Sequence, residues 1–128
     1  MRTLAWLGVV LLLSGCGLKE MRRQHLLKKE IKATLAEGLA ANPSGQHELE
    51  FQFQTRNGED AAKAVELFEA ANYDVDYMSL PDTHKCLVMV YRDMSVDDQE
   101  ALLVIVQDCL AVAGESVKRF HGLVVDPE

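Results

Sequence analysis

One stretch in the middle of the chain restricts the fold more than any other. Residues 48–54 read Glu-Leu-Glu-Phe-Gln-Phe-Gln, so that Leu49, Phe51 and Phe53 alternate strictly with polar residues. Successive side chains of a β-strand point to opposite faces, and this pattern therefore predicts a strand with one face on a core and one face in water. The chain should contain a sheet that is covered on one side only.

Further elements follow this strand in a regular order. An apolar stripe that starts at Ala61 predicts a helix over about 59–71, and alternation around Val75 predicts a strand over 73–77. A second helix should begin at the cap Ser95 and end before Gly114, and a last strand should cover 117–125. The order β-α-β-β-α-β predicts an α+β, ferredoxin-like sandwich, in which both helices cover one face of a four-stranded antiparallel sheet.

The open face of this sheet is the expected binding surface. The run Cys86–Tyr91 is continuously apolar, which predicts a central strand buried on both faces. It presents apolar side chains to the open face in either register, Val88 and Val90 or their neighbours Leu87 and Met89. We expect a partner-binding surface with the following members: Glu50, Gln52, Gln54, Val88 and Val90. The alternative is that a preceding helix covers this patch.

The start of the chain determines where the domain resides. Arg2 precedes an almost wholly apolar run from Leu4 to Leu13, too short to span a membrane and typical of a signal peptide. The sequence Leu13-Ser14-Gly15-Cys16 then resembles the lipobox of bacterial lipoproteins. That resemblance implies cleavage after residue 15 and a diacylglyceryl and an N-acyl lipid on Cys16, with no other cofactor expected. It places the protein on the periplasmic side of the cell membrane, and Gly17 favours the outer membrane.

Residues 16–46 form a basic tether between the lipid and the domain at 47–128. Between residues 19 and 32, six Lys and Arg residues face two Glu residues, a net charge of +4. Apolar residues at helical spacing predict a helix from about Lys19 to Leu39, which Asn42-Pro43-Ser44-Gly45 ends. The tether either rests on anionic headgroups or is a solvated spacer that packs loosely on the domain.

Composition excludes some functions and leaves others open. The chain carries 13 basic and 20 acidic residues, a formal net charge of −7, so we expect no nucleic acid partner. Besides Cys16 it has Cys86 and Cys109, which form either one disulfide or two buried thiols. The four histidines show no metal-ligand spacing, and we expect neither a metal nor an enzyme.

The domain also resembles a known family. The second strand reads Asn72-Tyr73-Asp74-Val75, the third Cys86-Leu87-Val88-Met89-Val90, and the last Phe120-His121-Gly122-Leu123-Val124-Val125-Asp126-Pro127. In these features the chain from Leu49 to Pro127 is similar to the B-type regulator of ribonuclease E activity. It departs from that family in its lipobox leader and in lacking a long acidic tail. The resemblance therefore implies the fold and not the inhibitory activity.

Two functions follow from these patterns. The leading hypothesis is a membrane-anchored, non-catalytic periplasmic domain that binds a protein partner or forms a homodimer. The alternative is a cytoplasmic inhibitor of ribonuclease E, which requires that the leader is no signal peptide, because a periplasmic domain cannot meet a cytoplasmic enzyme.

Overall fold

The computed structural model describes residues 21–126. The predicted signal peptide, the predicted lipidation site at Cys16 and the final proline of the family resemblance lie outside the described residues. The chain divides into two compact units, Met1–Glu30 and Ile31–Glu128. In the described part of the first unit, residues 21–30 are helical and exposed. No helix within residues 21–126 is long and apolar enough to cross a membrane.

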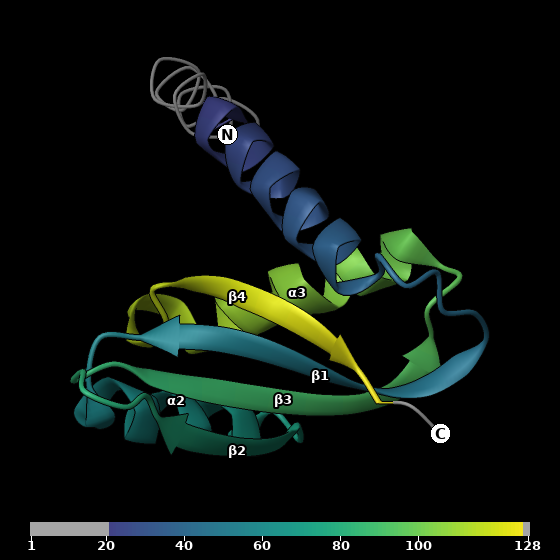
Figure 1. Cartoon of the computed structure of the whole chain (residues 1–128). Helices are drawn as coiled ribbons and strands as arrows, with labels where there is room; N and C mark the ends of the chain where they lie inside the picture. The colour runs from purple at the N-terminus through teal and green to yellow at the C-terminus, as the bar shows by residue number, and fades with distance from the viewer. Residues whose placement is uncertain (1–20, 127–128) are drawn as a thin grey trace, which may run out of the picture. The chain divides into compact units, whose positions relative to one another are not determined.

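The second unit is built on one antiparallel sheet (Figure 1). After a helical segment at residues 31–38, its elements follow in this order: β1 (Gln46–Thr55), α2 (Gly58–Ala70), β2 (Asp74–Ser79), β3 (Cys86–Ser95), α3 (Gln99–Ala113), a 3-10 turn (Gly114–Ser116) and β4 (Arg119–Val125). The strands lie in the order β2-β3-β1-β4. The predicted α+β class and the four-stranded antiparallel sheet are confirmed.

The core lies between the sheet and the helices. Phe51, Phe53 and Leu49 on β1 are completely buried, as the alternation predicts. The ring of Phe53 packs between those of Phe68 on α2 and Phe120 on β4, with centroid distances of 5.8 and 5.5 Å. Such tilted aromatic contacts add to the stabilisation from burial alone.

The helical segment 31–38 joins this same core. Ile31 and Leu35 are buried and cluster with the residues between the sheet and α2 and α3. A Cβ atom added at Gly38 would lie 2.6 Å from the carbonyl oxygen of Leu123, so the segment packs directly on β4. The predicted alternative, in which this helix covers the open face, is therefore wrong, because its apolar stripe faces the other side of the sheet.

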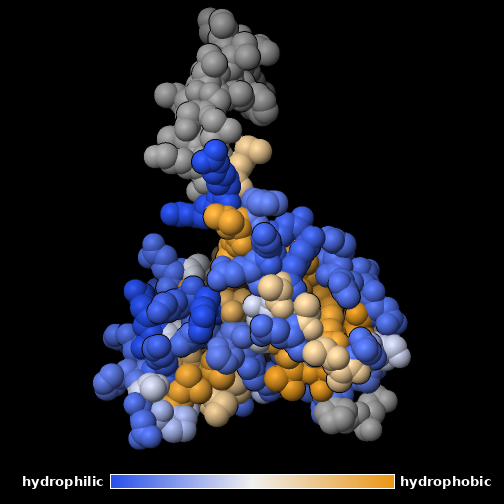
Figure 2. Space-filling model, turned by 45° about the horizontal axis from the view of Figure 1, so that its top comes forward, coloured by the Kyte–Doolittle hydropathy of each residue, from blue (hydrophilic) through white to orange (hydrophobic). Residues whose placement is uncertain are grey.

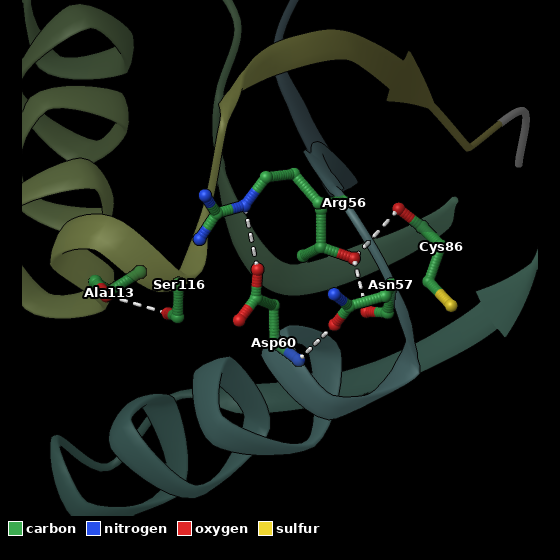
Figure 3. A network of polar contacts seen from close by, with 7 residues as sticks. Arg56, Asn57, Asp60, Cys86, Ala113 and Ser116 are labelled. Atoms are coloured by element: carbon green, nitrogen blue, oxygen red, sulfur yellow. Dashed lines mark hydrogen bonds and ion pairs between the residues drawn. The ribbon is translucent and has the colours of Figure 1, made fainter. Parts of the chain in front are cut away.

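The junctions between elements explain two local features. β3 continues to Ser95, which pairs with Gln46, so the predicted cap at Ser95 is wrong and Asp98 caps α3 instead. At the junction of β1 and α2, Asn57 Oδ1 accepts from the N–H of Asp60 at 2.8 Å, as Figure 3 shows. The hydroxyl of buried Thr55 lies 3.2 Å from the carbonyl oxygen of Cys86 and donates to it, which satisfies a polar group in the core.

Candidate interaction surface

Strand pairing decides which side chains reach the open face. Val90 lies opposite Phe51 and Val88 opposite Phe53, and directly paired residues of antiparallel strands point to the same side. Val88 and Val90 are therefore completely buried in the core and do not belong to the open face, where we expected them. Their neighbours Leu87 and Met89 lie there instead, beside Gln54 and Gln52.

The centre of the open face is polar at its surface. Leu87 and Met89 expose only 6% and 8% of their area. Around them, Arg119 Nε donates to Gln54 Oε1 at 2.7 Å, and Gln52 Nε2 donates to Glu50 Oε2 at 2.6 Å. The large apolar side chains that are exposed on this face lie on the two outer strands, Met78 on β2 and Val124 on β4.

Figure 2 shows the hydropathy of one side of the molecule. On the side of the second unit that is in view, hydrophobic side chains form separate patches among hydrophilic ones. Non-obligate interfaces are about as apolar as the rest of a protein surface, so this mixture is compatible with reversible binding of a partner.

A shallow pocket of about 170 Å³ lies at one end of the open face. Its lining comes from three strands and from the residue after the last one: Glu48, Glu50, Tyr91, Val124 and Asp126. Three carboxylates, one phenol and one apolar side chain suit an ammonium or guanidinium group on an aliphatic stem.

Tyr91 remains a neutral hydrogen-bond donor in this setting. Its burial, followed by the charge and hydrogen bond of Glu50 and the charges of Asp76 and Asp74, raises the pKa of the phenol above its ordinary value. Burial disfavours the charged phenolate because it removes the oxygen from water, and the neighbouring carboxylates repel its negative charge.

Acidic residues dominate the charge of the open face. Carboxylates from all four strands or their ends point to this side: Glu48, Glu50, Asp74, Asp76, Asp93 and Asp126. Arg119 is the cation paired into the same face. Over residues 31–128 the sequence has 7 basic and 18 acidic residues, a net charge of −11. This surface repels phosphates and attracts cationic groups.

The two cysteines of the domain are free, buried thiols. Cys86 is the first residue of β3. Cys109 lies beside Tyr73, the residue before β2, and the register of β2 with β3 places Tyr73 next to Arg92. Cys86 and Arg92 are six residues apart on one strand, which is about 20 Å. A disulfide needs Cα atoms within about 7 Å, so the bridge that the sequence allowed does not form.

Sequence reasoning missed several residues of this surface. Tyr91, Val124 and Asp126 gather with Glu48 and Glu50 only through pairing of β1 with both its neighbours. Tyr91 is the antiparallel partner of Glu50 on β3, and knowledge of this register would have identified it. In the described part of the chain, no three His, Cys, Asp or Glu side chains come together as metal ligands would.

The described part of the first unit is basic. Residues 21–30 contain Arg22, Arg23, Lys28 and Lys29 against Glu30, and all ten residues are exposed.

Comparisons with protein-family models, with curated proteins and with solved structures returned no match.

Proposed function

We propose that this protein is a lipoprotein that displays a non-catalytic, ferredoxin-like domain on the periplasmic side of a membrane and binds a protein partner there. The lipobox ending in Cys16 supports the anchor. The strand order β2-β3-β1-β4 is compatible with a ferredoxin-like fold and supports that part of the proposal.

The open face is the observation that carries the binding function. The sheet is covered by helices on one side, and its other side combines the exposed Met78 and Val124 with a hydrogen-bonded polar centre. Non-obligate interfaces are about as apolar as the rest of a protein surface, so this mixed face is compatible with a reversible protein contact. The pocket beside Tyr91 adds a place for a cationic side chain of the partner.

The anchor is tested by labelling intact cells with radioactive palmitate. The wild-type chain should take up label and a Cys16→Ser variant should not. A chain found in the cytosol with its first fifteen residues retained would contradict the anchor and favour the cytoplasmic regulator of ribonuclease E.

The binding surface is tested by site-specific photo-crosslinking in intact cells. A photoreactive residue at Gln52, on the open face, should give a discrete crosslinked product. The matched control is Val104, which is exposed on α3. Equal crosslinking from both positions, or none from Gln52, would contradict binding by the open face.

A further inference from the structure

The two edges of the sheet differ in how they are protected. Along β4, pairing with β1 shifts register between Gln52 and Phe53, and segment 31–38 packs on Leu123. Along β2, six consecutive residues pair with β3 without a shift, and every β2 residue except Val75 is exposed. Bulges and covering elements block the addition of a further strand, so β2 is the edge that can accept one.

The hydrogen-bond pattern shows which backbone groups of β2 face outward. The N–H of Leu80 donates to the carbonyl of Lys85 at 3.0 Å, which marks this pair as hydrogen-bonded. Such pairs alternate along an antiparallel ladder, so Asp74, Asp76 and Met78 bond toward β3. The backbone groups of the intervening Val75 and Tyr77 therefore point away from the sheet.

The side chain of Asp76 occupies the place of a missing strand. The N–H of Tyr77 donates to Asp76 Oδ1 at 2.8 Å. A carbonyl group of an added strand would take the same position, because the outward N–H is the donor that β-strand addition uses. Its arrival would release the carboxylate of Asp76 to pair with a cation.

Side chains on both sides of β2 determine what an added strand must carry. Asp74, Asp76 and Met78 point to the open face, and Val75 and Tyr77 to the other. Directly opposite side chains on neighbouring strands lie close enough to interact. A matching strand would place lysine or arginine beside the two aspartates and apolar residues beside the others, in a field set by the domain charge of −11.

Two other occupants fit less well. Pairing of β2 with β2 of a second copy would bring the aspartates of both copies together, and like charges on adjacent strands repel. The basic stretch of the chain itself, within residues 21–30, is helical and offers no strand.

We therefore propose that β2 docks an extended, lysine- or arginine-bearing segment of a partner protein as a fifth strand of the sheet. This inference rests on the proposed function, because it names the chemistry of the partner.

Two synthetic peptides test the proposal on the full chain. One alternates lysine with valine, and the other has glutamate in place of each lysine. Titration calorimetry should show binding of the lysine peptide and binding at least about tenfold weaker for the glutamate peptide, since like charges directly opposite destabilise a strand pair. Equal affinities would overturn the proposal.

Variants of β2 separate strand addition from simple attraction of charge. Tyr77→Pro removes the outward N–H but no bond to β3, since this N–H points away from β3. Proline is tolerated on an edge strand at a position whose N–H faces solvent. Tyr77→Ala is its matched control and removes only the side chain. Tyr77→Pro should lower the affinity for the lysine peptide by at least about tenfold relative to Tyr77→Ala. Equal affinities of these two variants would overturn the proposal.

A further variant keeps the test decisive if Tyr77→Pro does not fold. Asp74→Asn with Asp76→Asn retains the side-chain oxygen that accepts from Tyr77 but removes both charges. It should weaken lysine-peptide binding and reduce its salt dependence, and unchanged binding would contradict the proposal.

If crosslinking from Gln52 in cells persists undiminished with Tyr77→Pro, strand addition fails while the proposed function stands. If wild type gives no crosslink from Gln52, the proposed function itself fails.

Discussion

The thiol of Cys109 is completely buried in α3, beside the hydroxyl of Tyr73. Tyr73 donates to the carboxylate of Asp108, and the guanidinium of Arg92 lies 6.0 Å from the centre of its ring. Burial raises the pKa of the Cys109 thiol to about 12 from its ordinary 9.0. Burial, followed by the Asp108 hydrogen bond, also raises the pKa of Tyr73. Both groups are held in their neutral forms.

We predict that this raised thiol pKa makes stability fall at alkaline pH. Well below pH 9.0 the thiol is protonated in both states, and its contribution is fully present. Between pH 9.0 and about 12 the unfolded state ionises first, so stability is lost as pH rises. The slope is at most about 1.4 kcal/mol per pH unit for one group. Urea unfolding between pH 8 and 10 should therefore show a steeper decline for wild type than for Cys109→Ala. Equal slopes would contradict the prediction.

At the scale of elements, the helical segment 31–38 is a structural part of the domain. Ile31 and Leu35 are buried at 2% and 4% exposure, whereas Leu26 is 64% exposed. We predict that Leu35→Ala lowers the free energy of unfolding by about 2–5 kcal/mol, since it leaves a cavity in the core. Leu26→Ala, the same substitution at an exposed helical position, should change it by less than about 0.5 kcal/mol. Chemical denaturation measures both, and equal effects would show that the segment does not pack on the domain.

The contact of Gly38 with β4 gives a second test of this packing. A Cβ atom there would meet the backbone oxygen and Cβ atom of Leu123 at 2.6 and 2.8 Å. Backbone atoms cannot move aside without displacing the strand, so we predict that Gly38→Ala destabilises the domain by about 1–3 kcal/mol. At Gly58, the first residue of α2, an added Cβ atom has nothing within 4 Å. Gly58→Ala should therefore be neutral or stabilising in thermal and urea unfolding; a similar loss in both variants would argue against the contact.

The elements of this fold differ in how well their sequences predict them. The alternation around Phe51 predicts both β1 and the face that is buried, because its period of two matches the pleat. The apolar run of β3 predicts a central strand but gives no face, since every residue fits either side. The face of Val88 was therefore predicted wrongly, and only pairing with Phe53 decides it. Likewise, the apolar stripe at Ile31 and Leu35 predicts a helix but not the surface it covers.

At the scale of the whole molecule, charge is divided between the two parts of the sequence. Residues 1–30 carry 6 basic and 2 acidic residues, a net charge of +4, against −11 for residues 31–128. An anionic lipid surface attracts the first part and repels the second. If the lipid anchor forms at Cys16, cleavage removes Arg2 and leaves a net charge of +3 on residues 16–30. This separation of charge still favours contact of the basic stretch with headgroups while the acidic domain stays in solvent.

This charge separation predicts how the chain binds lipid when the anchor is absent. We consider residues 17–128, without leader or lipid, and vesicles containing phosphatidylglycerol. Lys28→Gln with Lys29→Gln should weaken binding by roughly 30-fold, because each basic residue near an anionic surface contributes about 1 kcal/mol. Lys63→Gln with Lys85→Gln changes the net charge equally but within the acidic domain, and it should have a much smaller effect. Vesicle sedimentation measures both, and binding should fall with added salt. Equal losses in the two double variants would mean that net charge, and not the basic stretch, determines the contact.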